Sequence, residues 1–394
     1  MSTAPLKICM ISDMHDAFDD RIYHKQALSM KKKGYEVTHI AVGKEHKEFI
    51  SDDGIKIITI PRKVFCSHFL LNKLYKILFN KDVFKKMFKY AEKEAADIYH
   101  IHDYKVLDIG LKLKRRFKNT KIIYDVHDPL PINILERPYG KFKKLHSYYV
   151  ALKEKKASKK YDYIITTEEN LAEYFRNFGI RNISIIYNFT TLNTEQEYIP
   201  MHMRKYDFFY CGLISENRGI FNIIDAIEDI KKQRETVSLL IVGPIHTPGL
   251  ETEIYTIIQK KNLESNIVIK PAVSYDEIGN YYKQCKIGFG IFLPLPTYHI
   301  ILQIKIFEYM IYGLPIIGSN FGHIANYIKK DHAGILVNPT DSHDIGKNAL
   351  ELLSNNELLE TYSKNGFEAA HKKYRWEYME TKLDTLYKEI THDI

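Results

Sequence analysis

The sequence has few cysteines, and they lie far apart. Cys9, Cys66, Cys211 and Cys285 form no C-x-x-C pair in 394 residues. This spacing indicates the reduced thiols of a cytosolic protein and no disulfide framework. The sequence also contains no repeat of solenoid length and no low-complexity tract. Repeat arrays and compositionally biased linkers are therefore excluded.

Long apolar runs are also missing. No stretch approaches the length of a membrane span, and the opening MSTAPLKICMIS lacks a signal-peptide pattern. We therefore expect a cytoplasmic protein whose attachment to the inner face of the cell membrane, if any, is peripheral. Positive charge, in contrast, is in excess, with a net charge of +8. It favours anionic partners such as nucleotide or lipid phosphates, an acidic membrane surface or nucleic acid.

Length and pattern predict a two-domain α/β protein. A chain of 394 residues is too long for one ordinary core, and 45% hydrophobic with 27% charged residues is typical of globular domains. Strands alternate with helices from residue 6, and the alternation restarts at residue 206. We expect a Rossmann-like domain over 1–190, a linker over 191–205, a second Rossmann-like domain over 206–372 and a terminal helix over 373–394.

Polar side chains follow three predicted strands of the first domain. His15, Asp19 and Arg21 come after the first strand, whereas His102-Asp103 and His127-Asp128 end two later strands. The carboxyl ends of parallel strands meet at one edge, where such folds bind ligands. In one alternative, Asp19 only caps a helix and pairs with Arg21. In another, a His-His-Asp group binds zinc, although the helical H-x-x-x-H spacing is missing.

The second domain opens with a candidate anion site. The strand 206–211 is followed by Gly212, by Arg218-Gly219 and by a helix over 220–231. Free N–H groups and the dipole at a helix N-terminus attract anions, and a guanidinium adds a forked cation suited to phosphate. The next strand, 239–242, ends tightly at Gly243-Pro244.

The stretch 286–322 contains a carboxylate inside an apolar helix. Glu308 follows Lys305 by one turn, and Gly313 with Pro315 ends the helix. A buried acid needs a partner, and a pair of sugar hydroxyls suits a group that only accepts hydrogen bonds. The alternative is a Lys-Glu pair on an ordinary core helix.

These motifs carry a family resemblance. KIFEYMIYGLPIIGS, residues 305–319, resembles the donor-site helix of the retaining GT-B glycosyltransferases of family 4, glycosyl transferases group 1. H-x-x-x-D-x-R-I-x-x-K, residues 15–25, is similar to the bacterial surface-polysaccharide subset. The resemblance implies the GT-B fold, with two Rossmann-like domains facing a central cleft and a C-terminal helix crossing back to the first domain.

The resemblance also assigns roles. Glu308 is expected to hold the ribose of a nucleotide sugar, Arg218 and Lys305 to stabilise phosphate charge, and His127 to contact the transferred sugar. The implied reaction is metal-independent, needs no cofactor and uses a co-substrate that is most often a UDP-sugar. A glycan or lipid-linked acceptor is held by the first domain. The expected donor residues are Gly212, Arg218, Gly219, Gly243, Lys305 and Glu308, and the acceptor-side residues are His15, Asp19, Arg21, His102 and Asp103.

The chain also departs from the family pattern. The first Glu of the family's E-x7-E is replaced by Ile300, and Leu213 stands where an Arg is usual. An active transferase and a noncatalytic partner subunit therefore both remain open. A sugar-nucleotide epimerase uses the same fold, whereas nothing but charge favours a nucleic-acid binder.

One basic segment has two interpretations. Residues 65–93 place apolar side chains at helical spacing and crowd the other faces with lysines. Such a segment lies on an anionic membrane, or it is an ordinary domain helix with a solvated lysine face.

Overall fold

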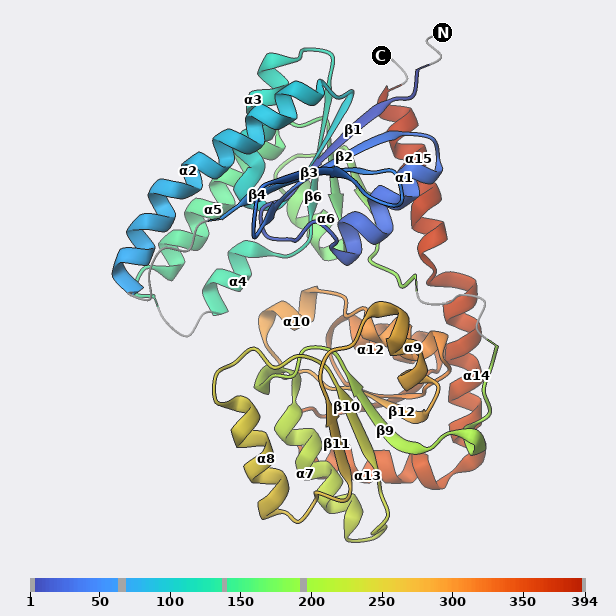
Figure 1. The fold of residues 1–394 in the computed structure, drawn as a ribbon. Helices are drawn as coiled ribbons and strands as arrows, with labels where there is room; N and C mark the ends of the chain where they lie inside the picture. Colours follow the sequence, from blue (N-terminus) through green and yellow to red (C-terminus); the bar gives the residue numbers. More distant parts are fainter. Residues whose placement is uncertain (1–3, 63–68, 137–139, 192–196, 392–394) are drawn as a thin grey trace. The chain divides into compact units, whose positions relative to one another are not determined.

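The chain consists of two compact units. The computed structural model describes residues 4–62, 69–136, 140–191 and 197–391. Unit 1 comprises Met1–Asn188 and Glu377–Ile394, and unit 2 comprises Phe189–Trp376 (Figure 1). The polypeptide therefore passes from one unit to the other twice.

Unit 1 is built on an eight-stranded sheet in the order β3-β4-β2-β1-β5-β6-β7-β8. The edge strand β3 runs antiparallel to β4, and the other pairings are parallel. The strands are β1 (Lys7–Ile11), β2 (Glu36–Gly43), β3 (Lys47–Ile50), β4 (Lys56–Pro61), β5 (Ile98–His102), β6 (Lys121–Val126), β7 (Tyr163–Thr166) and β8 (Ile183–Ile185).

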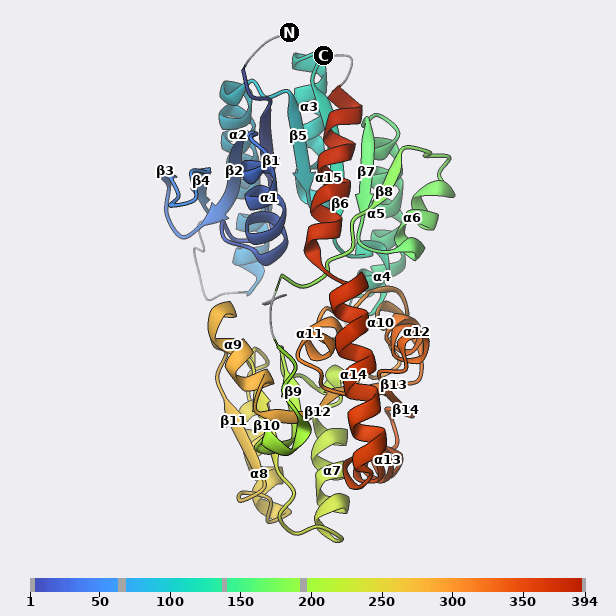
Figure 2. The same ribbon diagram turned by 90° about the vertical axis from the view of Figure 1, so that its right-hand side faces the viewer.

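Helices cover both faces of this sheet. They are η1 (Asp20–Ala27, a π-helix), α1 (Leu28–Lys32), α2 (Phe69–Glu94), η2 (Tyr104–Val106), α3 (Leu107–Arg116), α4 (Leu130–Glu136), α5 (Lys143–Ser158), α6 (Glu169–Arg176) and α15 (Trp376–Thr391). Helices α2, α3 and α5 lie on one face, and α1 and α15 lie on the other (Figure 1, Figure 2). Hydrogen bonds from Tyr35 to Asp384 and between Tyr387 and His100 fix α15 to unit 1.

Unit 2 contains a six-stranded, fully parallel sheet in the order β11-β10-β9-β12-β13-β14. This is the 3-2-1-4-5-6 order of dinucleotide-binding folds. The strands are β9 (Tyr206–Cys211), β10 (Leu239–Val242), β11 (Ile267–Lys270), β12 (Cys285–Gly290), β13 (Ile316–Ser319) and β14 (Gly334–Val337).

The helices of unit 2 sandwich this sheet. Apolar residues of α7, α8 and α13 form one buried cluster with the strands. Strands covered on both faces need continuous apolar runs, and β10 (LLIV) is buried at every position. The helices are η3 (Met201–Met203), η4 (Glu216–Arg218), α7 (Ile220–Lys231), α8 (Leu250–Lys260), α9 (Tyr275–Tyr282), α10 (Pro296–Ile300), α11 (Lys305–Ile311), α12 (Gly322–Asp331), α13 (Ser342–Ser354) and α14 (Asn356–Lys373).

The predicted α/β class is confirmed in both units. The sequence pattern predicted no element at β3, α4, α8 or α12, and a short helix, α10, lies between β12 and α11. In the basic segment, residues 63–68 and all side chains up to residue 81 lie outside the described residues. In the described half of α2, Val83 and Met87 are buried in the core of unit 1. That half is therefore an ordinary domain helix with its apolar side turned inward. Among the described residues, no helix combines the length and the apolar composition needed to cross a bilayer.

Candidate active-site residues in the two units

Each unit places its predicted site residues where the strand order reverses. In unit 2 the reversal lies between β9 and β12, and in unit 1 it lies between β1 and β5. Connections from such adjacent strands leave in opposite directions and open a crevice at their carboxyl ends. Gly212 directly follows β9, His15 lies in the loop after β1, and Asp103 directly follows β5.

Two of the predicted glycines are required because a side chain at either position would collide with a neighbouring residue. A Cβ on Gly243 would stand 1.9 Å from the carbonyl oxygen of Gly212, so the ends of β9 and β10 approach too closely for any side chain. Gly219 has a φ of +67°, and a Cβ there would stand 2.4 Å from Cγ2 of Ile291. Because neither position carries a side chain, the space beside the first turn of α7 stays free.

Arg218 and Lys305 bring two cations to this opening. Beside Gly212, Nη1 of Arg218 and Nζ of Lys305 each lie 3.8 Å from the position that a Cβ would occupy. The two groups belong to η4 and α11, which are far apart in the sequence. The fold thus brings two basic side chains together next to a helix N-terminus, an arrangement suited to binding a diphosphate.

Lys305 is buried, and its ammonium lacks a conventional partner. Within the described residues, Nζ of Lys305 and Nε of Arg218 are buried without a hydrogen-bond acceptor. Nζ instead lies over the rings of Tyr210, 4.0 Å from the centroid, and Phe292, at 5.1 Å. Burial, followed by the charge of Arg218, lowers the pKa of Lys305 to about 7. An anion bound here would supply the missing acceptor.

Glu308 projects from α11 and is held by a tyrosine that the sequence analysis did not identify. The hydroxyl of Tyr282 donates a hydrogen bond of 2.6 Å to Oε2 of Glu308. Tyr282 is fully buried, and its ring stacks on Tyr312 with centroids 5.0 Å apart. The side chain of Glu308 is only half-buried. Tyr282 therefore fixes one oxygen of the Glu308 carboxylate, while the carboxylate itself remains accessible to a ligand.

In unit 1, a histidine is held between two carboxylates. Nδ1 of His15 lies 2.8 Å from Asp19, and Nε2 lies 3.2 Å from Asp103. Burial alone would lower the pKa of His15, but the bonds to Asp103 and Asp19 raise it to about 10. His15 is thus an imidazolium at neutral pH. Asp19 also caps η1 by accepting from the N–H groups of Arg21 and Ile22, so the predicted cap is present. The predicted pairing of the Arg21 side chain with Asp19 is wrong, because the guanidinium pairs with Asp125.

Asp103 adopts a strained backbone to reach this position. Its φ is +77°, in a region that only glycine adopts freely. Its carboxylate accepts hydrogen bonds from the backbone N–H groups of Asp13 and Met14, and it also contacts His15. Asp103 therefore fixes the loop after β1 to the end of β5. Strain of this kind persists where the surrounding structure enforces it, as it does at binding sites.

His127 lies beside these groups and pairs with His102. Nε2 of His127 lies 3.1 Å from Nδ1 of His102, and the ring centroid of His127 is 4.6 Å from that of His15. Burial lowers the pKa of both His127 and His102, so both rings are neutral. Nε2 of His102 is buried without a partner in the described residues. A proton there would be an unsatisfied donor, so we place it on Nδ1 of His102, which leaves His127 with an N–H at its other nitrogen.

Two of the predicted acceptor-side residues are not at the surface. Arg21 is buried and contacts both carboxylate oxygens of Asp125, at 3.0 and 3.1 Å from Nη2. Gln26 donates to the same carboxylate at 2.5 Å, and His102 is completely buried. Arg21 and His102 therefore reach a ligand only through their neighbours. Asp125 organises this network, and its place in the YDVHD motif was the signal that could have identified it.

Two groups of side chains in the described residues have metal-ligand proximity. They are His15 with Asp103 and His127, and His100 with His102 and Asp125. In the first group, a metal must displace the proton that two carboxylates hold on His15. In the second, the guanidinium of Arg21 already occupies Asp125 and repels a dication.

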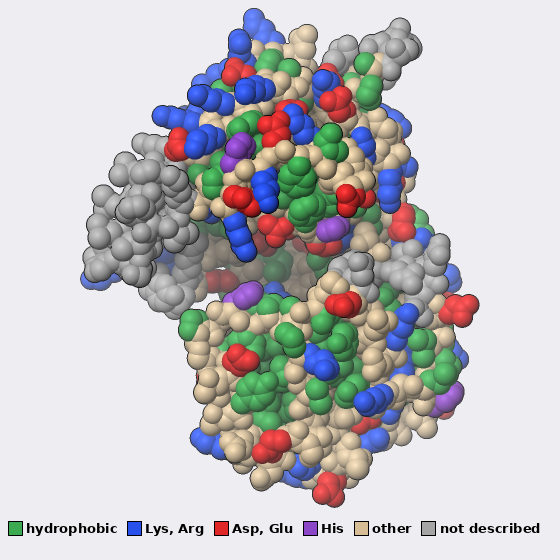
Figure 3. All heavy atoms as spheres, viewed as in Figure 1, with side chains coloured by type: hydrophobic (Ala, Val, Ile, Leu, Met, Phe, Trp, Pro, Cys, Tyr) green, Lys and Arg blue, Asp and Glu red, His purple; other side chains and the backbone are tan. Residues whose placement is uncertain are grey.

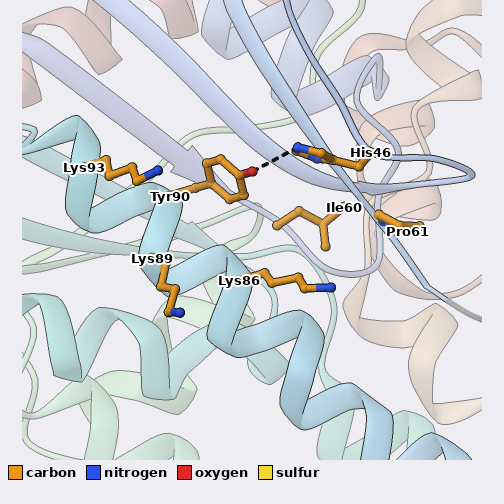
Figure 4. Close-up of a pocket in the computed structure, with 7 residues that line it drawn as sticks. All are labelled: His46, Ile60, Pro61, Lys86, Lys89, Tyr90 and Lys93. Atoms are coloured by element: carbon orange, nitrogen blue, oxygen red, sulfur yellow. Dashed lines mark hydrogen bonds between the residues drawn. The ribbon is translucent and has the colours of Figure 1, made fainter.

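One further hollow lies elsewhere in unit 1. A cavity of about 280 Å³ lies between β4 and the second half of α2, and none of the predicted site residues lines it (Figure 4). Tyr90 hydrogen-bonds His46 across it at 2.9 Å, above Ile60. Its basic rim consists of Lys86, Lys89 and Lys93. These lysines add to the many Lys and Arg side chains visible on unit 1 (Figure 3).

Comparison with known proteins finds glycosyltransferase relatives for both halves of the chain. The glycosyltransferase family 4 model matches residues 21–193, and the glycosyl transferases group 1 model matches residues 194–369. HepE of Anabaena, solved in complex with UDP and glucose, superposes with a TM-score of 0.68 at 13% identity, covering 98% of this chain and all of that one. Both halves of the chain match glycosyltransferase family models, and the fold is that of GT-B glycosyltransferases. The expected fold is confirmed.

The matches to curated relatives cover a smaller share of each chain. An uncharacterized glycosyltransferase of Methanocaldococcus jannaschii is 26% identical over 56% of this chain and 59% of its own length. The capsular polysaccharide biosynthesis glycosyltransferase CapM of Staphylococcus aureus is 24% identical over 50% of each chain. The matches thus span only half to three fifths of these relatives.

Proposed function

We propose that this GT-B glycosyltransferase moves a sugar, with retention of configuration and without a metal ion, from a UDP-sugar to a glycan or lipid-linked acceptor. The observation that carries the proposal is the buried, unpartnered ammonium of Lys305 beside Arg218. Two like charges in one buried pocket are costly unless an anion neutralises them. A nucleotide diphosphate supplies that anion and, as the leaving group, gains charge during the reaction.

In this proposal each site residue has a defined role in the transfer of the sugar. The bond between the sugar C1 and the diphosphate oxygen breaks, a new bond forms from C1 to the acceptor oxygen on the same face, and the acceptor proton passes to the leaving phosphate. Arg218, Lys305 and the N-terminus of α7 stabilise the growing phosphate charge. Glu308, oriented by Tyr282, accepts hydrogen bonds from the ribose hydroxyls. These roles need no metal as the counter-charge.

Unit 1 supplies the acceptor side in this proposal. The imidazolium of His15, with Asp19 and Asp103, offers charged and polar groups at the carboxyl edge of its sheet. The N–H of His127 offers a donor to a sugar hydroxyl. The choice of UDP follows HepE, whose structure contains UDP and glucose. The choice of a surface glycan as product follows CapM, which is named for capsular polysaccharide biosynthesis.

The test is thermal stabilisation by UDP-, GDP- and ADP-sugars. A ligand at 100 times its Kd adds about 2.7 kcal/mol to the free energy of unfolding. We expect UDP-sugars to raise Tm by a few degrees in the wild type and to have no effect on Glu308→Ala. Glu277→Ala, on the exposed capping box of α9, is the matched control and should retain the response. A folded wild type that responds to no nucleotide sugar contradicts the proposal.

A noncatalytic role is the second candidate, and Ile300 is the observation that favours it. This aliphatic residue ends α10 at the position of the first Glu of the family motif. Slow hydrolysis of the donor, followed by release of UDP, separates the candidates. An active transferase hydrolyses its donor even without an acceptor, whereas a noncatalytic subunit binds it and releases none. An epimerase is recognised by a changed sugar on an intact nucleotide.

A further inference from the structure

Helix α5 exposes an apolar stripe that nothing in the described structure covers. Large side chains at five positions are between 47% and 76% exposed: Phe142, Leu145, Tyr148, Tyr149 and Leu152. Together they expose on the order of 500 Å² of largely apolar surface, which is large for a single patch on a monomeric protein. Scattered single apolar residues need no explanation, but a contiguous stripe does.

The stripe has a regular helical basis. At 3.6 residues per turn, the five positions fall within about 120° of the helix circumference. The opposite side of α5 packs into unit 1 through Ser147, Val150 and Glu154, which are all buried. The helix therefore has one side packed against the core and an opposite, apolar side exposed to solvent.

The same segment is strongly basic. Residues 141–160 contain eight lysines and a single carboxyl group, Glu154. That carboxyl is buried and accepts hydrogen bonds from Tyr124 at 2.7 Å and Tyr174 at 3.0 Å. It contributes no negative charge to the surface. Lys141, Lys143 and Lys144 flank the start of the apolar stripe, and the other five lysines follow Leu152.

We propose that α5 docks unit 1 on an anionic phospholipid bilayer, with the apolar stripe at the acyl boundary and the lysines on lipid phosphates. This is the composition of an interfacial helix, since apolar burial and attraction to anionic lipids act together. The described half of α2 has similar lysines, but its apolar residues Val83 and Met87 are buried in the core. Among the described residues, α5 therefore combines an exposed apolar stripe with a lysine-rich surface, whereas the described half of α2 does not.

Charge also decides between a bilayer and a second copy of the chain. In a twofold dimer through α5, each copy would present the same patch to the other. The lysine-rich segment of one copy would then face the same segment of its partner; its own carboxyl group, Glu154, is buried, and the neighbouring Asp108 is already paired with Lys153. An anionic bilayer neutralises this charge, whereas self-association concentrates it.

The first test is co-sedimentation of the full chain with phosphatidylcholine vesicles that contain or lack phosphatidylglycerol. We expect binding only when the anionic lipid is present, and we expect salt to weaken it. Lys156→Gln combined with Lys159→Gln should lower partitioning by roughly 10- to 30-fold. Leu145→Ser combined with Tyr149→Ser should lower it by at least about tenfold. Binding that is indifferent to both pairs of substitutions overturns the proposal.

Matched controls come from unit 2. Lys329 and Lys330 are adjacent exposed lysines on α12, and Tyr255 on α8 is 50% exposed. Lys329→Gln with Lys330→Gln, and separately Tyr255→Ser, should leave partitioning unchanged. If these controls lose binding as strongly as the α5 variants, attraction is diffuse and α5 is not the docking face.

Tryptophan fluorescence measures how deeply α5 enters the bilayer. Trp376 is the sole tryptophan and is buried, so an added tryptophan gives a separate signal. Leu145→Trp should show a blue shift with anionic vesicles and quenching by brominated acyl chains, whereas Tyr255→Trp should show neither. A Leu145→Trp signal that changes with protein concentration but not with lipid would assign the stripe to self-association and overturn the proposal.

The docking proposal is independent of the donor chemistry. None of its residues belongs to the pocket around Lys305, so each α5 variant should retain the thermal response to nucleotide sugars. Loss of vesicle binding with the UDP-sugar response intact is the expected pair of results. A protein that binds vesicles through α5 but responds to no nucleotide sugar would refute the proposed function alone.

Discussion

Lys305 and Arg218 bring like charges into the same buried corner of unit 2, beside Gly212. Neither cation has a carboxylate within ion-pair distance among the described residues. The protein therefore retains an unfavourable arrangement in its free state that a bound diphosphate relieves. This relationship leads to two measurements, one on stability and one on binding.

Lys305→Met should stabilise the free protein while abolishing the donor response. The pKa of Lys305 is about 7 in the folded protein against an ordinary value of 10.5, so between these values the unfolded chain binds the additional proton. The wild type therefore becomes more stable as pH rises through this window. At pH 7 the substitution should add roughly 2–4 kcal/mol to the free energy of unfolding, and the gain should vanish near pH 10.5. Urea unfolding at both pH values measures it, and a loss of stability at pH 7 would contradict it.

UDP binding should take up a proton above pH 7. Only protonated Lys305 attracts the diphosphate, and in the free protein this form becomes scarce as pH rises above about 7. Affinity should fall by up to about tenfold per pH unit in that range. Calorimetry at pH 8 in two buffers of different ionisation enthalpy measures the uptake. Lys305→Arg keeps its charge, so its affinity for UDP should not change with pH in this range. A wild-type affinity that is equally independent of pH would contradict the role proposed for Lys305.

Tyr282→Phe should weaken ribose recognition without disturbing the fold. The substitution removes the hydroxyl that fixes Glu308 and leaves the ring stacked on Tyr312. We expect about 3- to 10-fold weaker binding of UDP and no change for its 2′,3′-dideoxy form. In a Glu308→Ala background, Tyr282→Phe should have no further effect. Equal losses for both nucleotides would show that Tyr282 acts on packing and not through Glu308.

His15→Gln should destabilise unit 1 at neutral pH and have less effect at high pH. The folded pKa of His15, about 10, lies above its ordinary value of 6.5. Its stabilising contribution is therefore complete below pH 6.5 and is lost as pH rises through about 10. We expect a cost of roughly 2–4 kcal/mol at pH 6 that approaches zero above pH 10. Urea unfolding tests this, with the exposed His146→Gln as control. A cost that does not depend on pH would mean that His15 is not held as an imidazolium.

The sequence predicted the parts of the donor site that are local in the chain. Glycines next to strand ends and a helix after Arg218 are short-range signals, and α7 has the predicted bounds of residues 220–231. It could not predict the partners that come from distant elements. Tyr282 reaches Glu308 from α9, and Asp125 holds Arg21 across 104 residues. Such contacts depend on which helices the strand order brings together, and no local pattern records that.

Some predicted residues lie deeper than expected for the same reason. Arg21 and His102 have the residue types of a binding site, but burial in unit 1 turns them into support for their neighbours. The basic segment shows the converse. Lysine spacing left both interpretations of residues 65–93 open, and only burial shows that the apolar side of the described half of α2 faces inward whereas that of α5 is exposed.

The double passage of the chain between the units reverses the usual order of folding during synthesis. Domains generally fold from the N-terminus as the ribosome releases them. Here residues 1–188 emerge first, but their helix layer is completed only by residues 377–394, which place Asp384 on Tyr35 and Tyr387 on His100. Unit 2 emerges as one continuous stretch between them. The nascent chain therefore finishes its second unit first, and the face that receives α15 stays uncovered until the last turns of that helix leave the ribosome.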